Sequence, residues 1–91
     1  MDEPDPIILP IEDFLDLHTF APRDVRSVVE EYLQQAVLHG YPEVRLIHGK
    51  GIGVQRAIVQ KTLSAHPLVL EFFDAPAERG GWGATVVRLR G

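Results

Sequence analysis

Apolar residues recur at two different periods along this chain, and the two periods alternate. Four short stretches are typical of strands: residues 14–18 alternate apolar with polar side chains, residues 43–47 and 84–89 place pairs of apolar residues two positions apart, and residues 69–73 are a largely apolar run. Two longer stretches repeat apolar residues every three or four positions, as is typical of helices, and cover residues 22–39 and 54–65. The predicted order of elements is therefore β-α-β-α-β-β.

This order predicts an α+β fold, a two-layer α/β sandwich in which a four-stranded mixed sheet carries both helices on one face. The helices are expected on the same side because strand-helix-strand connections are short and right-handed. The other face of the sheet is predicted to be open. Because side chains alternate between faces along a strand, the open face is assigned Arg45, Ile47, Glu71, Val86, Arg88 and Arg90, with Asp16 and His18 at one end.

The N-terminal stretch differs in composition from the rest of the chain. Residues 1–13 are acidic and contain three prolines, which bracket the apolar triplet 7–9. Proline restricts the residue before it to extended backbone, so we expect a tail over residues 1–6 and an extended lead-in over 7–13. The length of 91 residues suits one domain, which we assign to residues 14–91.

Composition excludes several classes of function. The chain has no cysteine, so it has no thiolate zinc site, iron-sulfur cluster, disulfide or cysteine nucleophile. No apolar run approaches the roughly 18 residues of a membrane span, and we expect a soluble cytoplasmic protein without membrane contact. The net charge is −4, from 9 Lys and Arg against 13 Asp and Glu. Such a balance argues against a general electrostatic grip on nucleic acid, so any site for a polyanion must be local.

A glycine-rich turn joins the second predicted strand to the second predicted helix. The segment His48-Gly49-Lys50-Gly51-Ile52-Gly53 holds three glycines in five residues. Such a turn directs backbone N–H groups and the positive end of the helix at one point, which binds anions. We therefore predict that Gly49, Lys50, Gly51 and Gly53 bind a phosphate group. The segment lacks the Gly-Lys-Ser/Thr ending of a nucleotide-binding P-loop, which argues against ATP, and the alternative is a turn without a ligand.

Asp16 and His18 are two residues apart in the first predicted strand, so their side chains project the same way. A carboxylate there orients the imidazole and raises its proton affinity, an arrangement suited to moving protons near neutral pH. The first two strands are joined by one crossover, so their carboxyl ends are expected at the same edge of the sheet, where ligand sites of α/β proteins are common. The predicted catalytic set is Asp16, His18, His48 and Lys50.

These residue types match the requirements of metal-free phosphodiester cleavage, namely a base, an acid and a positive charge for the transition state. RNA is the easier substrate because its own 2′-hydroxyl serves as nucleophile. The alternative is that Asp16, His18 and His48 hold a divalent metal, but their spacing matches no standard ligand pattern. We therefore expect no cofactor. His39 and His66 are interpreted as surface or capping residues.

Trp82 is the only tryptophan and lies in the segment Gly80-Gly81-Trp82-Gly83, before the last strand. A tryptophan in a loop can stack on an unpaired base, a contact worth about 1–3 kcal/mol. We predict nucleic-acid contacts by Trp82 and by the charges assigned near it, which are Arg79, Arg88 and Arg90. The alternatives are that Trp82 packs over the edge of the domain and that the arginines guard an edge strand against aggregation.

Three stretches together resemble the Smr (small MutS-related) domain family. They are Leu15-Asp16-Leu17-His18, then His48-Gly49-Lys50-Gly51 with Gly53-Val54, then Gly80-Gly81-Trp82-Gly83-Ala84-Thr85 followed by Val87 and Leu89. The resemblance runs from about Leu15 to Arg90 and implies the same sandwich fold, together with nicking of DNA or endonucleolytic cleavage of RNA. It places the family's Leu-Asp-x-His motif on Asp16 and His18 and its glycine-rich motif on residues 48–51.

Three hypotheses for function follow. The first is an endonuclease acting on RNA or on branched or nicked DNA, in which His18 and His48 exchange protons, Asp16 orients His18, and Lys50 with the loop amides holds the phosphate. The second is a non-catalytic nucleic-acid-binding module that uses the same residues. The third is an interaction domain whose open sheet face meets another protein. The oligomeric state does not follow from the sequence.

Overall fold

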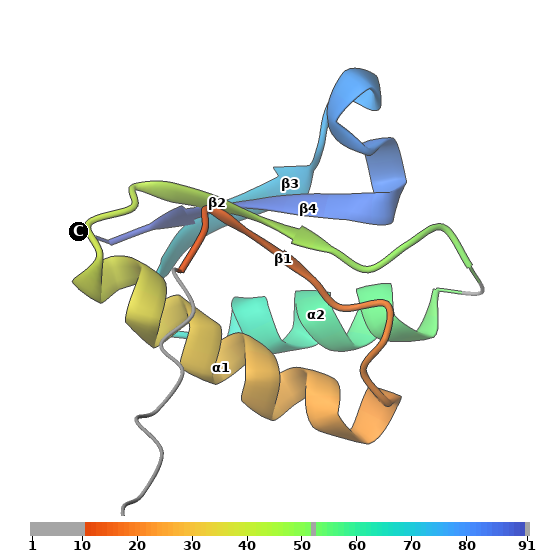
Figure 1. Ribbon diagram of the computed structural model, residues 1–91, viewed down its shortest axis with the longest axis horizontal. Coiled ribbons are helices and arrows are strands. Elements are labelled where there is room, and N and C mark those ends of the chain that lie inside the picture. Colours follow the sequence, from red (N-terminus) through yellow and green to blue (C-terminus); the bar gives the residue numbers. More distant parts are fainter. Residues whose placement is uncertain (1–10, 52, 91) are drawn as a thin grey trace, which may run out of the picture.

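A computed structural model describes residues 11–51 and 53–90 of the chain. A four-stranded sheet has the order β1-β2-β4-β3, with β1 at Phe14–Asp16, β2 at Glu43–Ile47, β4 at Ala84–Leu89 and β3 at Val69–Asp74. β1 pairs with β2 in parallel, whereas β4 runs antiparallel to both β2 and β3. Figure 1 shows both helices, α1 (Pro22–Leu38) and α2 (Val54–Ser64), on one side of this sheet. The predicted fold class is confirmed.

The strand and helix bounds differ from the prediction by a few residues. β1 ends at Asp16 rather than at residue 18, because the chain turns there, and the Phe20 amide donates to the carbonyl of Leu17. The loop after β3 contains two short 3₁₀ helices that the sequence pattern did not predict, Ala77–Arg79 and Gly81–Gly83. Stretches of three residues are too short for a period to be recognised.

Local sequence signals set both ends of α1. Pro22 stands at the first helical position, where its missing N–H costs nothing and its fixed φ suits the helix. Gly40 follows the helix with φ of 80°, a left-handed conformation that glycine adopts without strain. Among the described residues, neither helix is long and apolar enough to cross a membrane.

The core lies between the sheet and the two helices. The helices contribute one apolar stripe each, and alternate residues of the strands face them. Its fully or almost fully buried members are Leu17, Val25, Val29, Leu33, Ala36, Val44, Leu46, Val59, Leu63 and Val87. Apolar burial on this scale is the main force that holds the two layers together.

The open face of the sheet carries charged residues beside a small apolar cluster, as predicted. Strand register places Glu43, Arg88 and Glu71 across from one another, and Arg88 lies 3.2 Å from Glu71 and 3.7 Å from Glu43. Ala75, Ala84 and Val86 are nevertheless buried here, packed with Ile47. The loop after β3 helps to cover this face, since Arg45 Nη1 donates to the carbonyl of Arg79.

The last residues of the predicted lead-in pack against α1 and β2. The hydroxyls of Tyr41 and Tyr32 donate to the carbonyls of Ile11 and Glu12, and the Arg45 amide donates to the carbonyl of Asp13. Burial, with nearby acidic groups, raises the pKa of Tyr32, so its hydroxyl remains a donor. The predicted tail, residues 1–6, and residues 7–10 of the lead-in lie outside the described residues. The division into residues 1–13 and 14–91 stays a prediction.

Two leucines of α1 test how much the core contributes to stability. Leu33 is fully buried, whereas Leu38 is 76% exposed on the same helix. We expect Leu33→Ala to lower the free energy of unfolding by about 2–5 kcal/mol, since it removes apolar contacts and leaves a cavity. Leu38→Ala is the matched control and should change it by less than about 0.5 kcal/mol. Urea titration followed by circular dichroism measures both, and equal effects would contradict this packing.

Candidate functional site

Two loops meet at the edge of the sheet where β1 and β2 end. Parallel pairing puts Asp16 beside Ile47, and one residue further the Leu17 amide donates to the carbonyl of Ile47 over 2.7 Å. The chain then enters α1 through the loop that carries His18, whereas β2 continues into the glycine-rich loop before α2. Figure 1 shows both helices starting from this edge. The predicted meeting of the two strand ends is confirmed.

Asp16 and His18 form a hydrogen-bonded pair. Oδ1 of Asp16 accepts from the backbone N–H of His18 over 3.0 Å and from its ring Nδ1 over 2.5 Å. These bonds from His18 hold the pKa of Asp16 below its usual range, the ring contact first among them. With Nδ1 engaged, Nε2 is the ring nitrogen left to face solvent, and the His18 side chain is 63% exposed. The pair is therefore oriented and accessible to solvent.

The glycine-rich loop is held open against the turn before β4. The amides of His48 and Gly49 both donate to the carbonyl of Gly83, at 3.0 and 2.9 Å. Gly49 and Gly53 have φ of 84°, which a residue with a side chain adopts only under strain. Apart from the chain neighbours, no atom of the described residues lies within 4 Å of where a Cβ would stand at Gly49, Gly51 or Gly53. The loop backbone is therefore open to a ligand.

Lys50 extends from this loop across the neighbouring glycines. A Cβ at Gly83 would lie 2.8 Å from Cγ of Lys50, and one at Gly81 would lie 3.9 Å from its Nζ. The missing side chains at these two positions leave a path for the lysine stem. α2 begins at Val54 with no acidic residue in its first turn, and its N-cap residue is Gly53, which has no side chain to cap the helix. A lysine and uncapped helix N–H groups therefore stand at the same loop, which is a favourable setting for an anion.

A small hollow of about 180 Å³ lies at the start of α2 and is lined by His48, Gly49, Gly51, Gly53, Val54, Gln55 and Arg56. Gln55 and Arg56 were not among the predicted site residues. Arg56 pairs with Asp74 over 2.8 Å, and its Nε is buried without a partner among the described residues. Gln55 donates to the carbonyl of Phe20 over 2.6 Å. The sequence did contain a signal for Gln55 and Arg56, because both lie in the first turn of a predicted helix that follows a glycine-rich loop.

His48 has a different environment from that of His18. It is only 6% exposed, because side chains alternate along the strand: Ile47 points to the open face, and His48, the next residue, points to the side of the helices. Its Nδ1 lies 3.3 Å from the carbonyl of Gly49 and its Nε2 2.9 Å from the hydroxyl of Thr85. A carbonyl only accepts, so Nδ1 carries the proton and Nε2 of the neutral ring accepts from Thr85. Burial lowers the pKa of His48 and so favours this neutral form.

The predicted exchange of protons between His48 and His18 is therefore not favoured by this geometry. Within the described residues, no hydrogen bond joins His48 to Asp16 or His18. The physical reason is the alternation of side chains along a strand. Asp16 and its partner Ile47 point to the open face, whereas His48, the residue after Ile47, points to the other side. Both rings stand near one sheet edge, but one is exposed and the other is enclosed.

The predicted nucleic-acid contacts divide into two groups. Trp82 is 47% exposed and stands one residue from Gly83, which binds the glycine-rich loop. Arg88 and Arg90 lie toward the other end of β4, at least four residues or about 13 Å along the strand from Ala84. Arg79 and Arg88 also lie within 4 Å of Glu43. Arg88 and Arg90 are thus farther along the chain from Trp82 than Arg79 is, and the contacts of all three arginines with nucleic acid stay predictions.

The alternative metal site is not formed. Within residues 11–51 and 53–90, no group of three or more His, Asp or Glu is arranged to hold a metal ion. Asp16, His18 and His48 therefore do not make the ligand set considered above, because the His48 ring is turned away from the other two.

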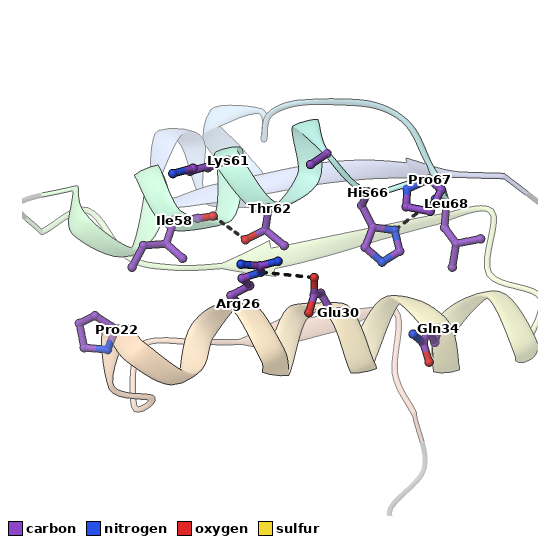
Figure 2. A pocket seen from close by; sticks show the side chains of 11 residues that line it. Pro22, Arg26, Glu30, Gln34, Ile58, Lys61, Thr62, His66, Pro67 and Leu68 are labelled. Carbon is purple, nitrogen blue, oxygen red and sulfur yellow. Dashed lines mark hydrogen bonds and ion pairs between the residues drawn. The ribbon is translucent and has the colours of Figure 1, made fainter.

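A larger hollow of about 790 Å³ runs between the two helices, away from the predicted residues (Figure 2). Arg26, Glu30 and Gln34 line it from α1, and Ile58, Lys61 and His66 from α2 and the turn after it. None of the predicted site residues lines this groove. Arg26 and Glu30 pair across its α1 side, 3.4 Å apart and exposed. Size alone does not favour the groove over the sheet edge, where the reactive side chains stand.

Comparison with known proteins places the chain in a family. The model of the Smr domain matches residues 15–90, and the chain belongs to the Smr domain family. In structure it is similar to the Smr domain of Thermus thermophilus MutS2, with a TM-score of 0.83 and 36% identity over 86% of this chain and 98% of that one. It is equally similar to YdaL, a stand-alone small MutS-related protein from Escherichia coli, with a TM-score of 0.83 and 31% identity over 90% of this chain and 67% of that one.

Curated relatives are much longer than this chain. It is 45% identical over 76 residues to endonuclease MutS2 of Geobacillus thermodenitrificans, which covers 84% of this chain and 10% of that protein. It is 37% identical over 75 residues to endonuclease MutS2 of Helicobacter pylori, covering 82% of this chain and 10% of that protein. The chain thus spans about a tenth of the length of these relatives.

The environment of His48 predicts how stability depends on pH. Because burial lowers its pKa in the folded state, the unfolded chain binds the proton more tightly. The free energy of unfolding should therefore fall as pH decreases from about 7 to 5, through and below the ordinary histidine pKa. His48→Gln should flatten this dependence, whereas the exposed control His39→Gln should leave it as in the wild type. Urea titrations at each pH measure it, and an unchanged slope in His48→Gln would contradict this environment.

Proposed function

We propose that this domain is an endonuclease that cleaves or nicks phosphodiester bonds in RNA or in branched or nicked DNA. One observation carries the proposal. The exposed, hydrogen-bonded pair of Asp16 and His18 lies at the same sheet edge as the open glycine-rich loop with Lys50. The MutS2 relatives are named endonucleases, which supports the reaction class.

In this proposal His18 accepts a proton and Asp16 holds its ring. On RNA, Nε2 of His18 takes the proton of the 2′-hydroxyl as its oxygen attacks phosphorus. The new P–O bond forms while the bond to the 5′-oxygen breaks, and the leaving oxygen takes a proton from water. On DNA, a water molecule replaces the 2′-hydroxyl as the nucleophile. Asp16 stabilises the imidazolium through its bond to Nδ1.

The phosphate would be held by Lys50 and by backbone N–H groups of the glycine-rich loop and the first turn of α2. Gly49, Gly51 and Gly53 present no side chains that would exclude it. The charge that develops on the phosphate oxygens in the transition state is then stabilised by Lys50 and by fixed dipoles. Trp82, exposed beside the loop, is suited to stack on a neighbouring base.

We assign His48 a positioning role in place of proton transfer. Its ring is enclosed and bonded to Thr85, and its backbone amide fixes the loop to Gly83. Neutral His48 also adds no charge next to the phosphate. The positive charge on the open face of the sheet is partly neutralised, because Arg79 and Arg88 both lie close to the carboxylate of Glu43. The grip on the substrate is therefore local, in keeping with the net charge of −4.

The experiment that tests the reaction uses labelled single-stranded RNA and nicked, branched and supercoiled DNA, with and without EDTA. We expect the wild type to cleave at least one of them. Asp16→Asn and His18→Ala should lower the rate by roughly 10²–10⁴, the usual contribution of general acid–base catalysis. Lys50→Ala should lower the rate and weaken binding, because it removes a charge beside the phosphate.

His39→Ala is the matched control, because His39 is exposed and lies at the end of α1 outside the proposed site. It should cleave at the wild-type rate. Undiminished cleavage by His18→Ala and Asp16→Asn would remove the catalytic assignment. Salt-sensitive binding without cleavage in every condition would favour a non-catalytic nucleic-acid-binding module instead. Absence of both would favour the protein-interaction domain.

A further inference from the structure

Gln55 joins the two loops of the candidate site. Its side-chain amide leaves the first turn of α2 and donates to the carbonyl of Phe20, 35 residues away, over 2.6 Å. Phe20 ends the turn that carries His18, since its own amide donates to the carbonyl of Leu17 over 3.0 Å. One side chain therefore reaches from the hollow at the glycine-rich loop to the turn that carries the imidazole.

The turn with His18 has few other attachments. Leu17 is anchored by its amide to Ile47 and by its buried side chain, whereas His18, Thr19 and Phe20 are all exposed. Within the described residues, the bonds of His18 go back to Asp16 in its own segment. Among these contacts, the bond from Gln55 is the one that ties the far end of the turn directly to α2.

We propose that Gln55 is a positioning residue that fixes the distance between the imidazole of His18 and a phosphate held at the glycine-rich loop. This inference rests on the proposed endonuclease function. Gln55 lines the hollow at the start of α2 as well as holding Phe20, so the same residue touches both halves of the site. A base displaced by about 1 Å from its reacting atom can cost a factor of about 100 in rate.

The side-chain amide suits this role better than a charged group does. A carboxylate at position 55 could not donate to a carbonyl and would repel the phosphate. A lysine could donate but would add a second charge to a site that already has Lys50. Glutamine donates without a charge, so it sets geometry while leaving the electrostatics of the loop unchanged.

The test compares Gln55→Met with Gln60→Met in the full chain. Methionine keeps the length of the side chain and removes the donor. Gln60 lies on the same helix, and its side chain makes no hydrogen bond within the described residues, so it is a matched control. Both variants should unfold at the wild-type urea midpoint. Gln55→Met should lower kcat on the cleaved substrate by roughly 10–100-fold with KM changed less than about twofold, while Gln60→Met keeps both constants.

A second readout does not depend on cleavage. Amide hydrogen exchange by NMR reports whether the turn is held, and Gln55→Met should speed exchange at Phe20 by about tenfold or more, with no change in Gln60→Met. Gln55→Lys, which restores a donor, should return exchange at Phe20 toward the wild-type rate. If the wild type cleaves nothing but exchange responds as expected, the proposed function fails while the tie between the loops is supported.

Three results would overturn the inference. Unchanged exchange at Phe20 in Gln55→Met would mean that this bond does not hold the turn. Faster exchange with unchanged kcat in an active enzyme would mean that the turn need not be held for the reaction. A fall in kcat with unchanged exchange would mean that Gln55 acts by another route than the position of His18.

Discussion

The parallel pairing of β1 with β2 is the constraint on which the candidate site depends. It brings the carboxyl ends of two strands together, so that the turn after Asp16 and the loop after Ile47 start from neighbouring points. Both segments then enter helices, whose first turns lie at the same sheet edge. A carboxylate, an imidazole, a lysine and unpaired backbone N–H groups can meet there although 34 residues separate Asp16 from Lys50. The same pairing buries Leu17 in the core, so the stability of the fold and the geometry of the site share one interaction.

The glycines of residues 80–83 allow this segment to support the glycine-rich loop of residues 48–53. The carbonyl of Gly83 accepts both amides at the start of the glycine-rich loop, and the stem of Lys50 passes over positions 83 and 81. A Cβ at Gly83 would lie 2.8 Å from that stem and 3.3 Å from the backbone of Gly49. The absence of a side chain is therefore a condition for the loop to keep its shape. The turn before β4 acts as a support for the lysine, and Trp82 stands exposed beside it.

The two histidines of the motifs show how burial gives one residue type two uses. His18 is exposed and hydrogen-bonded to the carboxylate of Asp16. His48 is enclosed and bonded to Thr85 and to the backbone, and its pKa is lowered. Desolvation favours the neutral form of the His48 ring, and in the proposed function this ring positions the loop without transferring a proton. In the proposed function the proton transfer is therefore assigned to the His18 imidazole alone, and the proposed role of Gln55 is to hold the turn that carries it.

Residue patterns along the chain were enough to predict the order of elements, the face that each strand buries and the sheet edge at which Asp16, His18 and the glycine-rich loop meet. These features follow from periodicity and from the handedness of short crossovers, which are local or nearly local properties. The folded structure was needed to show that the His48 ring is enclosed and that Gln55 reaches Phe20. Such features depend on which side chains become enclosed when the layers pack and on which segments become neighbours in space. The pattern of residues along the chain carries no information about either.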